Sequence, residues 1–451
     1  MFRSPFKNFF RFDGSYWLLV LPVLFVTVPW VQYRVRGIIP FAIVMLWLLP
    51  KLQRVFHLFY SREGRAFCLS FFWFSMLMFL QEMYAIFGSQ VHMKFYQFAT
   101  VAMHMVFFFV AFYTIGSRKY SELRFLTVVT LIGFILGGMS SIRGLGVGGL
   151  ESARVMTGLK TTDRMLSADQ IDNAIQVMEI GLGGYSYMYH CAWLIGVLMI
   201  AFVLTKDVRL RILYLVTGIS AAISVKVGGL GTPVGIIVVQ TMIFLLWLCI
   251  RNKHVVAVCG FSLVGLFFIY AITPEVFSFL VGPLESIAES LNDGSLRERV
   301  ISMADAFKGL DSYSYSRAQL QLISFDTFCK HPFFGVFSPM AQGSQLDLCG
   351  HSYILDIAGG YGLFGIFILL MFIWSLLRYF RVLGELYFGR KWSIMPVFVM
   401  IFFVFSGIMN PVTFFPNFIY LLPGIAWLSL TYQEKSELYW RYNQVDWNYN
   451  Y

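Results

Sequence analysis

The chain has 451 residues, of which 58% are hydrophobic and 13% are charged, and its mean hydropathy is +0.70. A soluble domain cannot bury so many apolar side chains, so the composition excludes a soluble protein and indicates a helical protein with several membrane spans. A transmembrane β-barrel is disfavoured because its strands would be short and alternating, whereas the apolar runs here are continuous. The net charge of +10 does not indicate nucleic-acid binding, because most basic residues lie in short segments between apolar runs.

The N-terminal stretch carries Arg3, Lys7 and Arg11 and enters a long apolar run near Tyr16 without a small-residue cleavage site. This pattern predicts an uncleaved first helix rather than a signal peptide. The fold predicted for residues 1–451 is therefore one all-α transmembrane domain of about 12 helices. The predicted spans, the second of which is the weakest and ends at Pro50, are residues 14–33, 37–50, 66–87, 94–115, 125–142, 184–205, 209–225, 233–250, 254–273, 351–377, 393–409 and 414–431.

Lysine and arginine in the flanks predict the orientation, because short cytoplasmic loops are enriched in both residues. With the N-terminus placed in the cytoplasm, most basic side chains fall on the cytoplasmic side, and both termini are predicted to be cytoplasmic. The residues that carry this bias are Lys51, Arg54, Arg62, Arg65, Arg118, Lys119, Arg124, Lys206, Arg209, Arg211, Arg251, Lys253, Arg378, Arg381, Arg390, Lys391, Lys435 and Arg441.

Two long segments, residues 143–183 and 274–350, remain on the outer side, and neither has the composition of a disordered region. In the second, two sets of apolar residues recur at helical spacing and predict amphipathic helices at the membrane face. The first set is Leu296, Val300, Met303 and Phe307. The second set is Leu322, Phe325 and Cys329, with Ser316 as the predicted N-cap.

Cys329 and Cys349 flank a His331-Pro332 turn in the predicted outer segment, where an oxidising compartment permits disulfides. A bridge between them would close a loop of roughly twenty residues and restrict the unfolded chain. Two unrelated buried thiols are the alternative. The other four cysteines lie in or beside apolar runs.

Ionisable groups are concentrated in the stretch of residues 316–365. His351 stands at the predicted outer mouth of a span, where an imidazole can act as a base or acid near neutral pH, or can anchor the end of a helix. Asp356 lies about 140° round that helix from His351, so the two are not expected to form a pair. Arg317, Arg297 and Arg299 carry guanidinium groups that bind phosphate in a bidentate manner, although salt bridges to nearby aspartates are an alternative for each.

Two other cations stand beside glycines at predicted outer ends of spans. Lys226 lies in SVKVGGLGTP and Arg143 lies in SSIRGLGVGG, where glycine allows a ligand to approach the backbone closely. Both are candidates for binding an anion, and a side chain that extends to the interface is the alternative for Lys226. Glu82 and His190 lie toward the outer ends of their spans and are candidates for lining a cavity, whereas His104 is expected to be packed. The sequence has no HExxH, CxxC or Asp-x-Asp motif and no phosphate-binding loop of the Walker type, so neither a metal nor a nucleotide is indicated.

The stretch from Ser316 to Gly365 resembles the O-antigen polymerase and ligase superfamily of bacterial inner-membrane proteins, which includes the Wzy-type polysaccharide polymerases. The resemblance rests on Ser-Arg at 316–317, His-Pro-Phe-Phe-Gly-Val at 331–336, Gly-His at 350–351 and Gly-Leu-Phe-Gly at 362–365. The family usually has His-Asn where this chain has His351-Ser352. The motif covers some fifty residues, and the predicted topology extends the likeness along the chain.

The resemblance implies transfer of a glycan from undecaprenyl diphosphate at the periplasmic face. The donor supplies its own leaving group, so no cofactor or metal is expected. Arg317 matches the family's diphosphate-binding arginine, Lys226 stands where the family often has Ser-Arg, and His351 matches the histidine of the catalytic loop. The two long outer segments would then be periplasmic, and residues 274–350 would form the catalytic loop.

The sequence thus favours a polymerase of O-antigen or capsule repeat units, with lipid-linked donor and acceptor oligosaccharides, membrane lipids and a chain-length regulator as expected partners. A ligase that attaches the finished glycan to lipid A–core shares the motif and is the close alternative. A flippase or secondary transporter is a third hypothesis. It would require charged residues at several span midplanes and helices broken in paired halves, neither of which the sequence shows.

Overall fold

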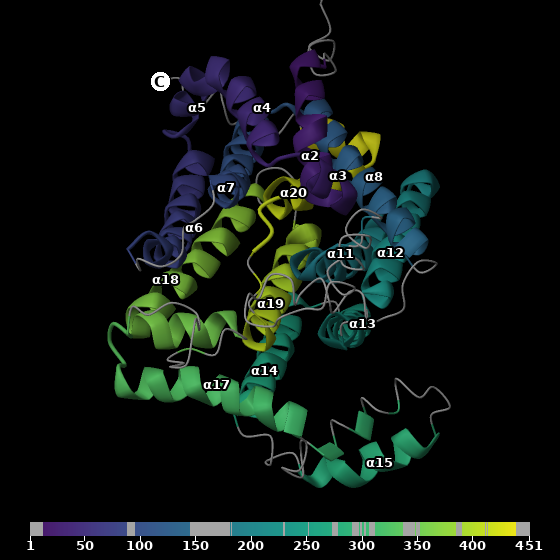
Figure 1. Cartoon of the computed structure of the whole chain (residues 1–451). Coiled ribbons are helices and arrows are strands. Elements are labelled where there is room, and N and C mark those ends of the chain that lie inside the picture. The colour runs from purple at the N-terminus through teal and green to yellow at the C-terminus, as the bar shows by residue number, and fades with distance from the viewer. Residues whose placement is uncertain are drawn as a thin grey trace, which may run out of the picture.

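The computed structural model describes residues 12–87, 95–144, 183–228, 231–250, 252–272, 278–290, 312–336, 352–384, 390–410 and 414–438, together with a few single positions between them. The described residues form helices joined by short connections (Figure 1). The elements are η1 (Gly14–Leu19), α2 (Val20–Thr27), α3 (Pro29–Arg34), α4 (Ile38–Leu48), η2 (Leu49–Lys51), α5 (Leu52–Leu58), α6 (Arg62–Phe87), α7 (Phe95–Gly116), α8 (Tyr120–Gly144), α11 (Tyr185–Leu204), α12 (Val208–Val227), α13 (Gly231–Ile250), α14 (Lys253–Ile272), α15 (Val281–Ser290), α17 (Ser312–Lys330), α18 (Tyr353–Leu383), η5 (Arg390–Ser393), α19 (Ile394–Met409) and α20 (Phe418–Ser429).

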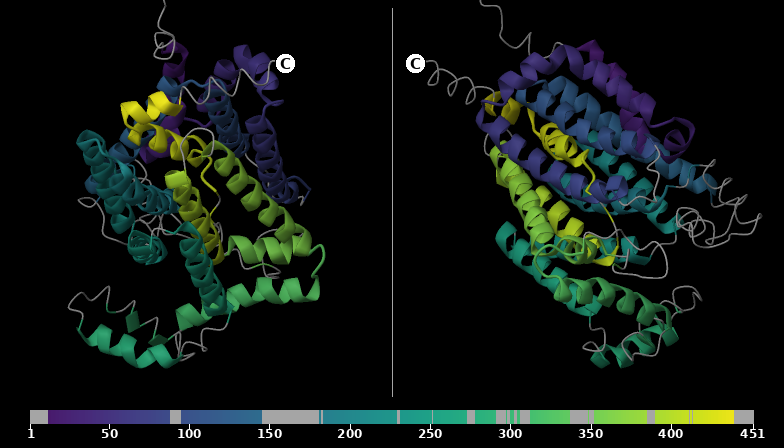
Figure 2. Two further views of the ribbon diagram at one scale, coloured as in Figure 1. Left: turned by 180° about the vertical axis from the view of Figure 1, so that it is seen from behind. Right: turned by 60° about the vertical axis from the view of Figure 1, so that its left-hand side comes forward.

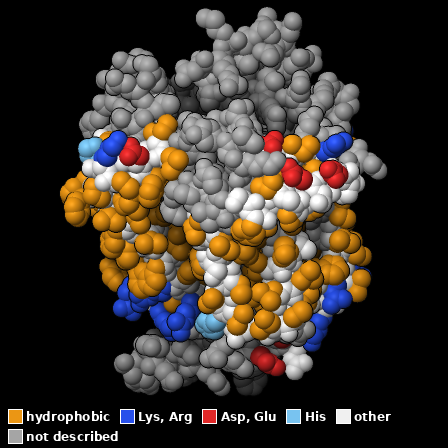
Figure 3. Space-filling view, turned by 90° about the horizontal axis from the view of Figure 1, so that it is seen from below, with side chains coloured by type: hydrophobic (Ala, Val, Ile, Leu, Met, Phe, Trp, Pro, Cys, Tyr) orange, Lys and Arg blue, Asp and Glu red, His pale blue; other side chains and the backbone are white. Residues whose placement is uncertain are grey.

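Within the described residues, eight helical stretches are long and apolar enough to cross a membrane, which makes this a polytopic membrane protein. They are Ile38–Leu58, Arg62–Leu80, Tyr120–Arg143, Ser186–Leu204, Val208–Val227, Thr232–Ile250, Tyr353–Leu383 and Lys391–Met409. Shorter apolar helices occupy the remaining predicted spans, at Gly14–Thr27, Val106–Gly116, His254–Leu266 and Phe418–Ser429. A belt of hydrophobic side chains lies between two rims where charged side chains gather (Figure 3).

The second predicted span does not stop at Pro50. The proline lies in the first turn of η2, and the helical stretch continues through α5 to Leu58. Proline is compatible with the first turn of a helix because the N–H that it lacks would have no intrahelical partner there. The expected end at residue 50 was therefore wrong.

The segments predicted to be cytoplasmic gather at one end of the helices, which we call the termini end. The Asp13 backbone N–H donates to Glu122 Oε1 at 2.9 Å, and Lys119 Nζ lies 3.9 Å from that same oxygen. Lys391 Nζ donates to Glu434 Oε1 at 2.6 Å, which joins η5 to the helical turn at residues 432–438. The right-hand view of Figure 2 shows the long helices side by side between this end and the opposite one, the distal end.

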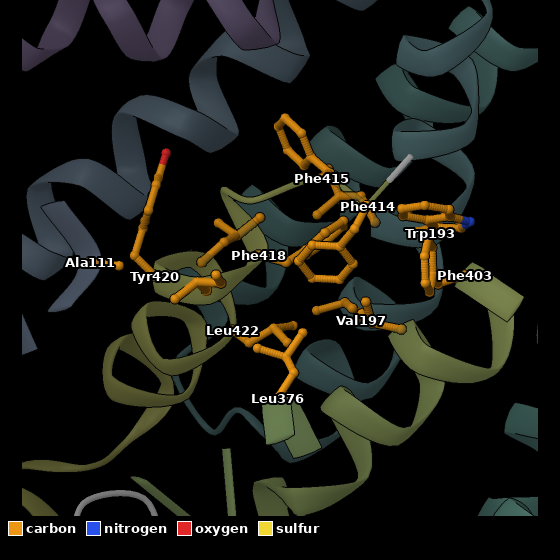
Figure 4. Close-up of a cluster of buried hydrophobic side chains, with 14 of the residues drawn as sticks. Ala111, Trp193, Val197, Leu376, Phe403, Phe414, Phe415, Phe418, Tyr420 and Leu422 are labelled. Atoms are coloured by element: carbon orange, nitrogen blue, oxygen red, sulfur yellow. The ribbon is translucent and has the colours of Figure 1, made fainter. Parts of the chain in front are cut away.

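The last predicted span, residues 414–431, is only partly helical. Residues 414–417 are buried but not helical, and α20 begins at Phe418. Pro411 and Pro416 explain the interruption, because proline disfavours helix in the residue before it and lacks a backbone donor. Phe414 and Phe415 fill an aromatic cluster with Trp193 (Figure 4), so other helices cover this irregular backbone, as a membrane interior requires.

Helix α18 is kinked at Gly362, which has φ 63° and ψ −152°. The turn at residues 331–336 fits into this kink. The carbonyl oxygens of Pro332 and Phe333 accept hydrogen bonds from the backbone N–H groups of Leu363 and Phe364, at 2.7 and 3.1 Å. The two parts of the motif, 331–336 and 362–365, therefore complete each other's backbone hydrogen bonds.

Replacement of Gly362 by alanine is expected to destabilise the protein. A Cβ there would lie 2.5 Å from the carbonyl carbon of Phe333, and the backbone angles are nearly restricted to glycine, which costs about 1–3 kcal/mol. The measurement is the temperature at which detergent-solubilised protein loses its folded peak in size-exclusion chromatography. Gly265→Ala is the matched control, because no atom lies within 4 Å of its Cβ position in α14. Equal midpoints for the two variants would contradict the role of the kink.

Glu434 is expected to hold the C-terminal turn over a wide pH range. Burial alone would raise the pKa of its carboxyl, but hydrogen bonds from Lys391 and Thr431 outweigh burial and lower the pKa from 4.5 to about 2. The stabilisation is therefore complete above pH 4.5 and is lost as the pH falls through about 2. Glu434→Gln should accelerate tryptic cleavage after Lys435 several-fold, roughly as expected for loss of one charge-assisted hydrogen bond. In the wild-type protein, the cleavage rate relative to that of a free peptide should be the same at pH 8 and pH 6. Glu437→Gln, at an exposed neighbouring carboxylate, should cleave like wild type, and equal rates for the two variants would contradict this role of Glu434.

Candidate functional site

Helix α17, which contains Arg317, lies across the end of α14 (Figure 1). It begins at Ser312, so the predicted N-cap at Ser316 was wrong by about one turn. Its buried side is polar rather than apolar, because Gln321, Ser324 and Thr327 are buried whereas Leu322 is exposed. The apolar spacing thus identified the outward side of the helix, and a helix at the edge of a membrane bundle can expose apolar side chains where lipid surrounds it.

The last turn of α19 holds two of the segments predicted to carry the site. Ser352, which follows His351 in the chain, donates from Oγ to the carbonyl of Gly407 at 3.2 Å. Gln321, one helical turn after Arg317, donates from Nε2 to the next carbonyl, Ile408 O, at 3.4 Å. Because the last carbonyls of a helix have no intrahelical partner, they are free to accept these bonds.

Asn410, directly after α19, extends this contact to a third segment. Its backbone oxygen accepts from the N–H of Tyr353 at 3.3 Å, and its Nδ2 donates to Thr232 Oγ1 at 3.4 Å. Thr232 lies at the start of α13, six residues after Lys226, whose side chain is exposed near the end of α12. The end of α19 thus joins the backbone near Lys226 to the start of α18 and to α17.

Arg143 reaches the same region through the contact between α8 and α12. Ser141 Oγ donates to Ser224 Oγ at 3.2 Å, and each serine is two residues before a candidate cation, Arg143 or Lys226. A Cβ on Gly138 would lie 2.6 Å from Ser220, so the two helices run in the same direction in close contact. Arg143 and Lys226 are therefore exposed at the same end of two adjacent helices.

The remaining candidates are distributed as follows. His351, Arg299 and Cys349 lie outside the described residues, and the structure places only the backbone of Arg317 in α17 and of Glu82 in α6. Arg297 and Cys329 are exposed. Cys329 is a free cysteine in the structure, and its bridge to Cys349, which lies outside the described residues, stays a prediction. His190 is buried and stacked on Phe415 with ring centroids 4.2 Å apart, which places it in the aromatic core.

Sequence reasoning missed Gln321, Ser324 and Asn410. The signal for the first two is the presence of polar residues four and seven positions after Arg317, which places positions 317, 321 and 324 on one side of a helix. The signal for Asn410 is an Asn-Pro pair that ends an apolar run. Each becomes informative only once its partner on another helix is known.

The residues brought together at the distal end offer cations and neutral hydrogen-bond donors. Across the described parts of the chain, no group of three histidine, cysteine or acidic side chains is arranged to hold a metal ion. Exposed lysine and arginine beside helix ends can bind the charge of a phosphate or diphosphate.

Comparison with known proteins gives no match, either to a protein-family model or to a curated protein. The resemblance carried by residues 316–365 therefore depends on the motif itself. The backbone hydrogen bonds between residues 331–336 and 362–365 give these two parts of the motif a structural role.

Substitution of Ser352 by alanine is expected to weaken the attachment of α18 to α19. Ser352 Oγ also accepts from the backbone N–H of Leu355 at 3.2 Å, so it is the N-cap of α18, and loss of such a cap costs about 1 kcal/mol. The heat-induced loss of the folded chromatographic peak should occur at a lower temperature than in wild type.

Ser290→Ala is the matched control for Ser352→Ala. Ser290 is an exposed serine of α15 that bonds only to its own helix, so its removal should leave the midpoint unchanged. A Ser352→Ala midpoint equal to that of Ser290→Ala would contradict the capping role.

Proposed function

We propose that this protein is a bacterial inner-membrane glycosyltransferase that polymerises oligosaccharide repeat units linked to undecaprenyl diphosphate at the periplasmic face. In this proposal the chain has twelve spans, both termini are cytoplasmic, and the distal end faces the periplasm. The basic residues of the termini end support this orientation, since they lie where the positive-inside rule expects cytoplasmic loops.

The observation that carries the proposal is that described residues close in sequence to the candidates meet at one end of the helices. The end of α19 bonds to Ser352, Gln321 and Thr232, which follow His351, Arg317 and Lys226 in the sequence by one, four and six residues. Arg143 joins this group through the pair Ser141–Ser224. In the proposal the cations and His351 act together at this membrane face, which suits transfer from a lipid-linked donor that reaches the site from the bilayer.

The proposed reaction follows from the charges involved. The acceptor hydroxyl attacks the anomeric carbon of the donor sugar, the bond from that carbon to the diphosphate oxygen breaks, and the hydroxyl proton passes to His351. Arg317, Lys226 and Arg143 stabilise the negative charge that develops on the departing diphosphate. Undecaprenyl diphosphate leaves, so the free energy comes from the donor itself.

The distribution of buried charge supports an enzyme over a flippase or transporter. Of the described lysine, arginine, aspartate and glutamate side chains, only Glu122 and Asp356 are buried, and each lies in the first turn of its helix. A transport path would need such groups near several span midplanes. The ligase that transfers finished glycan to lipid A–core uses the same arrangement of groups and is separated by the experiment below.

The test is a glycan ladder on a gel from cells that lack the protein or carry His351→Ala, Arg317→Ala or Lys226→Ala. We expect the deletion and the first two variants to leave core plus one repeat unit, and Lys226→Ala to shorten or thin the ladder by about tenfold or more, since each removes charge stabilisation at the site. Lys330→Ala is the matched control, because Lys330 is an exposed cation of α17 paired with Asp326.

Three outcomes would change the proposal. A deletion that removes all surface glycan while lipid-linked polymer accumulates would identify the ligase. Accumulation of unpolymerised lipid-linked units on the cytoplasmic side would identify a flippase. An unchanged ladder in the His351 and Arg317 variants would overturn the site assignment.

A further inference from the structure

The contact between α17 and the start of α18 is close and polar. A Cβ on Gly359 would lie 2.8 Å from the backbone oxygen of Ser324, so the two helices meet almost backbone to backbone. At this contact Ser324 Oγ donates to Asp356 Oδ1 at 2.7 Å, and both residues are buried, with 0% and 3% of their surfaces exposed. The proposed reaction assigns no role to either side chain.

A buried carboxylate is an expensive way to join two helices. Desolvation offsets much of what the hydrogen bond contributes, and an apolar pair of similar volume often holds helices together equally well. A hydrogen bond differs from an apolar contact in being directional. The bond between Ser324 and Asp356 therefore contributes to the orientation of α17 more than to the attachment of α17 to α18.

The orientation of α17 decides where position 317 faces. Positions 317, 321 and 324 follow each other at intervals of four and three residues, so they share one side of the helix. Asp356 lies one turn after Ser352, the residue that follows His351 and is bonded to α19. Rotation of α17 about its axis would break the Ser324–Asp356 bond and turn position 317 away from the start of α18.

We propose that Asp356 and Ser324 are positioning residues, which fix the rotation of α17 and thereby the direction of position 317 relative to the start of α18. This inference rests on the proposed function, because it assigns the pair to the same transfer reaction. Neither side chain needs to touch the substrate. The requirement is for an acceptor at position 356 and a hydroxyl donor at position 324.

The test measures chain extension by purified protein in nanodiscs, with lipid-linked repeat units extracted from cells lacking the protein as substrate. Asp356→Leu should lower kcat by roughly a hundredfold with little change in KM, as a misplacement of about 1 Å does in other enzymes. Ser324→Ala should lower kcat by roughly tenfold, since the same misplacement is then only partial. Asp356→Asn should restore kcat to near the wild-type value, because its amide oxygen still accepts from Ser324.

Asp326→Leu is the matched control. It makes the same substitution on the exposed side of α17 and should leave kcat unchanged. The double variant with Ser324→Ala and Asp356→Leu should be no slower than Asp356→Leu alone, since both changes remove one interaction. If Asp356→Leu does not fold, Ser324→Ala and Asp356→Asn still decide the question.

Two results would overturn the positioning role while leaving the proposed function intact. Wild-type kcat in Ser324→Ala would show that the bond does not orient α17 for the reaction. Loss of activity in Asp356→Asn, with normal folding, would show that the negative charge itself is required. Failure of the wild-type protein to extend any chain would instead overturn the proposed function, so the two failures are distinguishable.

Discussion

The packing of the distal end depends on the carbonyl groups at the end of α19, which have no partner within their own helix. In a membrane protein such groups cannot rely on water, and leaving one buried without a partner costs several kcal/mol. Gly407 and Ile408 find donors in Ser352 and Gln321, and the backbone oxygen of Asn410 finds the N–H of Tyr353. The donors that satisfy these carbonyl groups of α19 therefore also bring α17 and the start of α18 together. Together with the bond from Ser324 to Asp356, these bonds fix α17 relative to the start of α18.

A second constraint acts at the other end of α17. The turn at residues 331–336 supplies the carbonyls that the kink of α18 at Gly362 requires, and Gly335 approaches Gly360 so closely that a side chain there would clash. Helix α17 is thus tied by Gln321 and Ser324 along its buried side and by this turn at its C-terminal end. The described part of the connection between α14 and α18 is thus held at several points, as the proposed site requires.

The sequence was sufficient for the broad architecture, because continuous apolar runs and flanking basic residues depend on composition alone. The non-helical residues 414–417 and the continuation of the second span to Leu58 were missed, since both depend on how prolines are accommodated by neighbouring helices. The choice of Arg143 and Lys226 came from local sequence, but their place at the same end of two adjacent helices depends on the pair Ser141–Ser224, two residues far apart in the chain. The apolar spacing in α17 marked its outward side, in agreement with a helix at the membrane face, but it did not indicate that Gln321, Ser324 and Thr327 would be buried. Gln321 and Asn410 had no local signal strong enough to choose them.

The measurement that tests the central idea most directly is photocrosslinking with an oligosaccharide-linked polyprenyl diphosphate that carries a diazirine on the sugar beside the diphosphate. The purified protein would be irradiated with this probe and the labelled residues mapped by mass spectrometry. The arrangement around the end of α19 predicts labels near Arg143, in residues 224–232, in the first half of α17 and around Ser352, all at the distal end. Labels at the termini end, or along the middle of the spans, would contradict the idea that these segments form one site.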